Sequence, residues 1–203
     1  MTLGRVEGQP PFVGLTGGLA AGKTEALRAL ERLGAATISS DDVVHELLAS
    51  EEVRDLLVER FGERVAPGGA VDRSAVAELV FADPEEGAWL EGELWPRVGR
   101  RIAAWREQLA SADEPPRAAV VEVPLLFEAE MEEGFDATVA IVARDRVREQ
   151  RAAERGHAGA ESRASRQLPQ KEKAKRADHV VENDGDLADL ERRLAAVLDA
   201  VTR

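Results

Sequence analysis

The sequence predicts an α/β fold in which a parallel β-sheet lies between two layers of helices, an α/β/α arrangement. Short apolar segments rich in β-branched residues alternate with amphipathic helical segments along most of the chain, an order typical of parallel sheets. A glycine-rich turn joins the first expected strand to the first helix. Residues 49–114, by contrast, are helix-forming and contain no convincing strand, which indicates a helical insertion.

Apolar runs and their boundary residues define the elements before the insertion. Residues 12–16 are apolar and end in the glycine-rich turn, as expected for a short buried strand. The helix after this turn carries alanine and leucine on one face and ends at Gly34. A second strand is expected at residues 35–38, and the Ser-Ser-Asp-Asp sequence at 39–42 caps the next helix.

Turn and cap residues divide the insertion, and strand patterns return after it. Asp72, Asp83 and Pro96 mark expected helix starts. The later elements are strands at 118–123, 137–142 and 179–181, an arginine-rich helix at about 144–155 and a helix from Asp186.

Charge and composition exclude several classes of protein. The formal net charge is −12 and there is no cysteine. Disulfides, thiol catalysis and thiolate zinc sites are therefore excluded, and a reducing compartment is compatible. Because a nucleic-acid-binding surface carries positive charge, we expect no nucleic-acid partner. The longest uncharged stretch, residues 8–22, is too short and too rich in glycine and proline to span a membrane, and the N-terminus is a poor signal peptide. We expect a cytoplasmic protein with no obligate protein partner.

Residues 17–24 match the P-loop pattern G-x-x-x-x-G-K-[ST] between a strand and a helix. Backbone N–H groups of such a loop point at phosphate oxygens, and the helix adds its positive end. The ammonium of Lys23 can reach the β- and γ-phosphates, and the Thr24 hydroxyl can bind Mg²⁺. The alternative is an ordinary glycine-rich turn. The other expected cradle residues are Gly17, Gly18, Ala20, Ala21 and Gly22.

A P-loop indicates a nucleoside triphosphate without fixing the reaction. The guanine-reading motif Asn-Lys-x-Asp of GTPases is absent, because asparagine occurs only at position 183. Small size and a helical insertion favour a small-molecule kinase. Another small-molecule or nucleoside monophosphate kinase, and a regulatory or nucleic-acid-associated ATPase, remain alternatives. The acidic charge disfavours the ATPase.

A set of motifs over residues 12–200 resembles one family, the dephospho-coenzyme A kinases. The resemblance implies ATP-dependent phosphorylation of the ribose 3′-hydroxyl of dephospho-CoA, the last step of CoA synthesis, with ATP and Mg²⁺. The motifs that carry it are Val13–Thr24, Ile38–Asp41 with Val43–His45, Val71–Arg73, Val80–Pro84, Leu94–Pro96, Val121–Glu128, Arg151 with Arg155, Arg163 with Gln167, Ala177–Asp178 and Asn183–Gly185.

The resemblance also implies an organisation into parts. A helical part binds CoA, and a lid closes over the nucleotide. The expected ranges are a flexible leader at 1–11, a P-loop core at 12–48 and 115–203, a helical CoA-substrate-binding insertion at 49–114 and a lid at 151–170.

Asp41 and Glu122 are the candidate carboxylates of the site. Asp41 follows the second strand, at the sheet edge where ligands bind in such folds, and it matches the catalytic base of the family. From the residues alone, a helix N-cap is an equal alternative. Glu122 ends the third core strand, where a carboxylate can reach Mg²⁺ through water. An ordinary polar residue closing a strand is the alternative.

Arginines near the C-terminal half are the candidate phosphate clamp. Arg155 is expected to act on the transferring group, with Arg151 and Arg163 on the nucleotide phosphates, since phosphoryl transfer requires cations near the γ-phosphate. The alternative is a solvated helix face paired with glutamates. The lysines at 171, 173 and 175 are expected to form a solvated face.

Four positions depart from the family pattern. Ala20 stands where a glycine is usual, which is tolerable at negative φ. Ser39 replaces the first carboxylate of an Asp-Ala-Asp segment, Glu122 replaces an aspartate, and Trp95 replaces a histidine.

Overall fold

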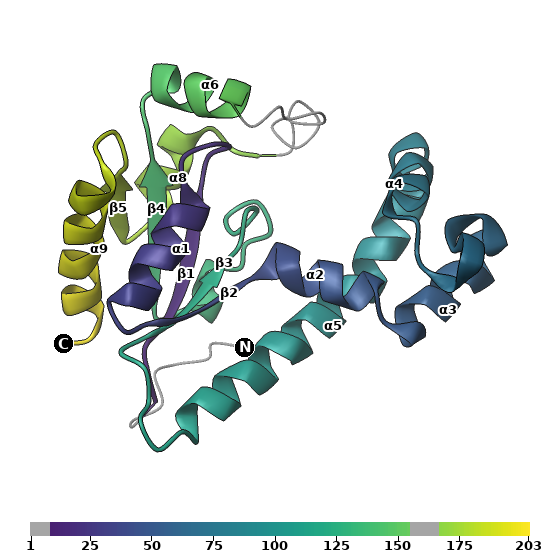
Figure 1. The fold of residues 1–203 in the computed structure, drawn as a ribbon, viewed down its shortest axis with the longest axis horizontal. Coiled ribbons are helices and arrows are strands. Elements are labelled where there is room, and N and C mark those ends of the chain that lie inside the picture. The colour runs from purple at the N-terminus through teal and green to yellow at the C-terminus, as the bar shows by residue number, and fades with distance from the viewer. Residues whose placement is uncertain (1–8, 155–166) are drawn as a thin grey trace. The chain divides into compact units, whose positions relative to one another are not determined.

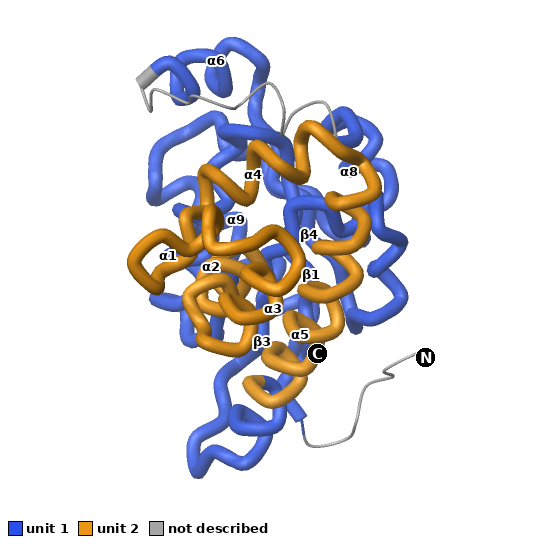
Figure 2. The backbone as a smooth tube through the Cα atoms, turned by 90° about the vertical axis from the view of Figure 1, so that its right-hand side faces the viewer, with its two compact units in different colours: residues 1–39, 106–203 blue, residues 40–105 orange. Residues whose placement is uncertain are grey.

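The computed structural model describes residues 9–154 and 167–203. The chain forms two compact units, residues 1–39 with 106–203 and residues 40–105, which are coloured blue and orange in Figure 2. The second unit starts at residue 40 and ends at 105, whereas the sequence predicted an insertion over residues 49–114.

The first unit contains the strands of the sheet and the helices that follow several of them (Figure 1). They are β1 (Phe12–Gly17), α1 (Lys23–Arg32), β2 (Ala36–Ser39), β3 (Ala119–Glu122), the 3₁₀ turn η3 (Glu132–Gly134), β4 (Ala137–Val142), α6 (Asp145–Glu154), α8 (Gln170–Arg176), β5 (His179–Glu182) and α9 (Leu187–Val201). The second unit is helical. It contains α2 (Ser40–Leu48), α3 (Glu51–Phe61), the 3₁₀ turns η1 (Glu63–Val65) and η2 (Pro67–Gly69), α4 (Arg73–Ala82) and most of α5 (Pro84–Ala110).

The five strands of the first unit form one sheet in the order β2-β3-β1-β4-β5. Every neighbouring pair is parallel, which confirms the predicted α/β fold. The register pairs Glu122 of β3 with Leu15 on one side and Ser39 on the other. The carboxyl ends of these strands therefore meet at one edge, where β1 leads into the P-loop.

The two faces of the sheet bury different partners. Val13 and Leu15 of β1 belong to the core that α1 and α9 form against the sheet, and Figure 1 shows these two helices side by side. Gly14 faces the other way, where a Cβ would lie 2.6 Å from Leu126 and 2.9 Å from Phe135. This close approach of the 124–135 segment explains why β1 has a glycine there.

The helical unit has its own core, which also explains its first boundary. Buried Val53, Leu57, Val65, Val76 and Leu94 form the centre of this core. Val44, Leu47 and Leu48 of α2 pack against the same cluster, so α2 belongs to the helical unit although it directly follows a sheet strand.

The second boundary lies where α5 begins to contact the sheet domain. The guanidinium of Arg106 lies 4.4 Å from the ring centre of Phe12 and 3.8 Å from a carboxylate oxygen of Asp136. The last turn of α5 therefore belongs to the first unit.

Two of the three expected helix starts are correct. Asp72 accepts hydrogen bonds from the first backbone amides of α4, and Asp83 accepts one from Glu85. The expectation at Pro96 is wrong, because this proline lies inside the continuous helix α5. In the described ranges, 9–154 and 167–203, the helices are too short or too polar to cross a bilayer.

Candidate active site

The P-loop wraps tightly between β1 and α1. The Ala21 amide donates to the Gly18 carbonyl at 3.1 Å, and Gly22 has a φ of 97°. A Cβ on Gly22 would lie 2.1 Å from the side-chain nitrogen Nδ2 of Asn183. Both the backbone conformation and the contact therefore require glycine at this position.

Two side chains donate hydrogen bonds to backbone carbonyl groups of the loop. Asn183, buried after β5, donates to the Ala21 carbonyl at 2.8 Å, and Arg148 of α6 donates to the Leu19 carbonyl at 3.4 Å. The described peptide bonds are all trans, so the N–H of each next residue points opposite to that carbonyl. The amides of Ala20 and Gly22 therefore point away from Arg148 and Asn183, which leaves them available to an anion.

The ammonium group of Lys23 lies over the loop. Its Nζ donates to the carbonyls of Gly17 at 3.3 Å and Gly18 at 3.5 Å, and it lies 3.8 Å from a carboxylate oxygen of Glu122. A compact cation held by weak carbonyl contacts can exchange them for phosphate oxygens. Thr24 follows at the exposed first turn of α1.

Glu122 lies at the adjoining strand end in a buried position, 7% exposed. Its second carboxylate oxygen accepts a hydrogen bond of 2.9 Å from the Ser39 hydroxyl. Ser39 and Glu122, which both differ from the family pattern, thus form a hydrogen-bonded pair. The longer glutamate side chain still places a carboxylate beside Lys23.

Ala20 has a φ of 57°, so the expected condition for alanine here, a negative φ, is not met. A left-handed conformation costs an alanine about 1–2 kcal/mol, whereas glycine loses only about 0.5–1 kcal/mol more chain entropy on folding. We expect Ala20→Gly to raise the Tm by about 1–4 °C, measured by calorimetry.

Ala21→Gly is the matched control, because Ala21 is fully buried and is not among the described residues with positive φ. Its replacement removes a buried methyl group and adds chain entropy, so the Tm should fall. A lower Tm for Ala20→Gly as well would contradict strain at position 20.

The candidate base lies in the other unit. Asp41 is the second residue of α2 and is exposed. The helix begins at Ser40, so Asp41 lies in the first turn and not at the N-cap position, where Ser39 stands.

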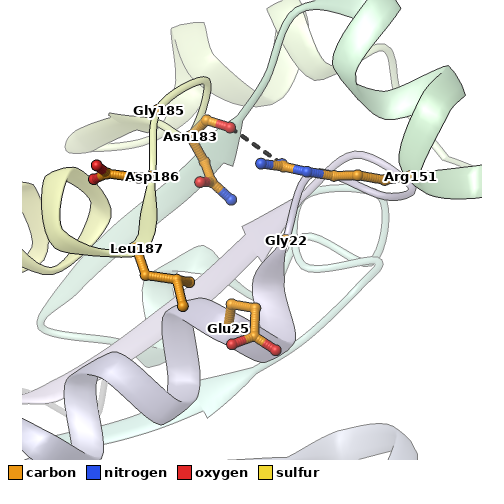
Figure 3. A pocket seen from close by; sticks show the side chains of 7 residues that line it. All are labelled: Gly22, Glu25, Arg151, Asn183, Gly185, Asp186 and Leu187. Carbon is orange, nitrogen blue, oxygen red and sulfur yellow. Dashed lines mark hydrogen bonds between the residues drawn. The ribbon is translucent and has the colours of Figure 1, made fainter.

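A pocket of about 350 Å³ lies beside the P-loop at the start of α1 (Figure 3). Arg151 borders this pocket and donates to the Asn183 carbonyl at 3.1 Å. The structure thus brings Arg151 to the P-loop, whereas Arg155 and Arg163 lie outside the described residues. The lining residues are Gly22, Glu25, Arg151, Asn183, Gly185, Asp186 and Leu187.

Comparison with known proteins identifies the family. The family model described as dephospho-CoA kinase matches residues 11–189. The chain belongs to the dephospho-CoA kinase family. A dephospho-CoA kinase from Thermus thermophilus is 35% identical over 203 residues, covering 98% of this chain and 96% of that protein. One from Protochlamydia amoebophila is 36% identical over 187 residues, covering 90% and 92% of the two chains.

Two solved structures have folds similar to that of this chain. A crystal structure of a Thermus thermophilus protein, 35% identical, has a TM-score of 0.79 and covers 95% of this chain and 98% of its own. A dephospho-CoA kinase structure from Campylobacter jejuni, 22% identical, has a TM-score of 0.64 and covers 95% and 97%. The second likeness shows the shared fold.

Lys173 of this dephospho-CoA kinase family member is buried. The sequence predicts a solvated face of Lys171, Lys173 and Lys175, which is wrong for Lys173, because its side chain is 0% exposed. Burial lowers the pKa of Lys173 below its usual 10.5, and the hydrogen bond and charge of Glu128 oppose that shift. Lys171 and Lys175 are exposed as expected.

Arg148 and Asn183 were not singled out as phosphate-loop residues. Each contacts a P-loop carbonyl across more than a hundred residues of chain. A local pattern does not reveal such contacts. The sequence offers two signals: Asn183 stands in the Asn183–Gly185 motif of the family resemblance, and both residues follow a predicted strand.

Proposed function

We propose that this chain transfers the γ-phosphate of ATP to the ribose 3′-hydroxyl of dephospho-CoA, giving coenzyme A and ADP. The observation that carries the proposal is the position of Lys23 in the phosphate loop. Its ammonium group lies 3.8 Å from the carboxylate of Glu122, at the carboxyl ends of neighbouring strands. Membership in the dephospho-CoA kinase family supplies the acceptor.

The nucleotide base and ribose have a place beside the P-loop. The pocket of about 350 Å³ lies within the size range of small-ligand sites, roughly 300–1,000 Å³. Its wall includes Gly22 at one side and the apolar side chain of Leu187 at another. ATP with its phosphates on the loop would extend its nucleoside toward this pocket, with Arg151 at the border.

Mg²⁺ fits the oxygen donors at the loop. We propose Thr24 as a direct ligand and Glu122 as a ligand through water. Mg²⁺ is usually bound by one or two protein oxygens together with phosphates and water, and these two residues supply such a set. When bound, Mg²⁺ would neutralise charge on the β- and γ-phosphate oxygens.

Transfer needs a base, a cation clamp and a leaving nucleotide. The Asp41 carboxylate accepts the proton of the 3′-hydroxyl as that oxygen forms its bond to the γ-phosphorus. The bond from the γ-phosphorus to the oxygen that bridges it to the β-phosphorus breaks, and ADP leaves with that oxygen. Lys23 stabilises the charge on the transferring group, with Arg155 and, on the nucleotide phosphates, Arg151 and Arg163.

The setting of the reaction is part of the same proposal. We propose a cytoplasmic enzyme acting on a small-molecule substrate without an obligate protein partner, because its cysteine-free composition is compatible with a reducing compartment.

The test measures ADP release with ATP and Mg²⁺ in the presence of one acceptor at a time. Dephospho-CoA should support turnover, whereas adenosine, AMP, pantetheine and water should give at most about a hundredth of that rate. Each of these smaller acceptors lacks either the adenosine end or the pantetheine end of dephospho-CoA, and so lacks binding contacts that would position the hydroxyl. Preferred turnover of AMP or another small acceptor would replace the proposed substrate. ADP release indifferent to every acceptor would indicate an ATPase.

A further inference from the structure

Lys173 is a buried charge that lies outside the proposed chemistry. It stands on α8 with 0% of its side chain exposed. Removing an ammonium group from water is costly unless every proton finds an acceptor. The three acceptors around Nζ therefore indicate what this lysine holds together.

The contacts of Nζ join three segments of the sheet domain. Nζ lies 2.5 Å from the Pro124 carbonyl, 3.4 Å from the Thr16 hydroxyl and 2.9 Å from a carboxylate oxygen of Glu128. An ammonium group has three donors, and here each has its own acceptor. The Thr16 hydroxyl also donates to the Pro124 carbonyl at 3.3 Å, which closes the network.

Two of these acceptors adjoin parts of the phosphate site along the chain, and the third joins the segment before α8. Thr16 immediately precedes Gly17, the first residue of the P-loop. Pro124 follows Glu122 by two residues, and Glu122 faces Lys23. Glu128 further accepts a 2.6 Å hydrogen bond from the Leu168 amide, shortly before α8 begins.

We propose that Lys173 is a positioning residue for phosphoryl transfer, which fixes the P-loop and Glu122 relative to each other through Thr16, Pro124 and Glu128. It touches neither ATP nor acceptor in this role. A displacement of about 1 Å at reacting groups can cost on the order of a hundredfold in rate, so a buried brace behind both groups controls catalysis. The charges of Lys23 and Glu122 both act on the Lys173 ammonium, which is consistent with this proximity.

The test separates positioning from stability by removing both charges together. Lys173→Met alone leaves the Glu128 carboxylate without its cationic partner, so this variant should have a much lower Tm than the wild type. Lys173→Met with Glu128→Gln removes both charges and keeps an acceptor for the Leu168 amide, so the Tm should stay within about 5 °C of the wild type.

We expect the double variant to bind ATP with Mg²⁺ at least threefold more weakly and to lose at least tenfold in kcat, because the loop and Glu122 shift apart. The matched control is Lys175→Met with Glu172→Gln, an exposed pair on the same helix at 2.7 Å, which should leave both values unchanged. ATP affinity within threefold of the wild type in a folded double variant would overturn the proposal.

The expected loss of kcat rests on the proposed function. The ATP-binding measurement tests the role of Lys173 independently of the acceptor. ATP affinity is measured without acceptor, so a wild type inactive on dephospho-CoA would refute the acceptor while the affinity comparison still decides on Lys173. If the double variant fails to fold, Glu128→Gln alone takes its place with the same threefold threshold. Its single amide oxygen can still accept from the Leu168 amide, while Lys173 loses its charged partner.

Discussion

Lys23→Met is expected to lower kcat/KM for ATP by about a thousandfold or more. The ammonium now rests on the Gly17 and Gly18 carbonyls beside Glu122, so the wild type needs little reorganisation to reach a phosphate. Cations aimed at a transferring phosphoryl group contribute about 10³–10⁵ in rate, and a methionine of similar length supplies none of that charge. Steady-state kinetics with varied ATP measures the loss.

Lys23→Arg tests whether charge alone suffices. A guanidinium is planar and wider than an ammonium group, and the loop carbonyls approach Lys23 Nζ to 3.3 and 3.5 Å. We expect a loss close to that of methionine. Lys175→Met is the control, because Lys175 is exposed and pairs only with Glu172 among the described contacts. Recovery of most activity with arginine would mean that charge and not shape matters.

The sheet and the phosphate loop could be predicted from local patterns. Residues 119–122 are apolar up to Glu122 and form the buried strand β3, because a strand covered on both faces needs a continuous apolar run. Spacing predicts the loop at 17–24, since its glycines allow a backbone conformation that few other residues can form and Lys23 supplies the cation for phosphate.

The burial of Lys173 could be predicted only in part from the sequence. Residues two positions apart on a helix are about 200° apart around its axis, so Lys173 cannot share a face with Lys171 and Lys175. One of the two faces had to contact the domain. Which face it is depends on Glu128 and Pro124, more than forty residues away, and no local pattern contains that information.

The start of the helical unit also depends on contacts between distant residues: the sequence predicts residue 49, whereas the unit begins at residue 40. The apolar residues of α2 predicted an amphipathic helix correctly. Such a helix could pack either on the sheet or on the helical insertion. In the structure it packs on the cluster around Leu57 in the insertion, a contact that the pattern of α2 alone does not predict.

The remaining large effect concerns Asp41→Asn, for which we expect unchanged ATP binding and a kcat lower by about 10²–10⁴, the range for a lost general base. Asparagine has the same shape but does not accept the proton of the acceptor hydroxyl at neutral pH. The measurement is kcat with saturating dephospho-CoA beside the ATP affinity of the same variant.

The competing explanation is a carboxylate that merely supports the start of α2. Asp42 tests this explanation, because it is the next residue in the same first turn and is also exposed. Both carboxylates stabilise the positive helix end by no more than about 1 kcal/mol, so Asp41→Asn and Asp42→Asn should lower the Tm alike. Only Asp41→Asn should lower kcat. Equal kcat values for the two variants would reduce Asp41 to a helix-end charge, and the base would then have to be another group that reaches the 3′-hydroxyl.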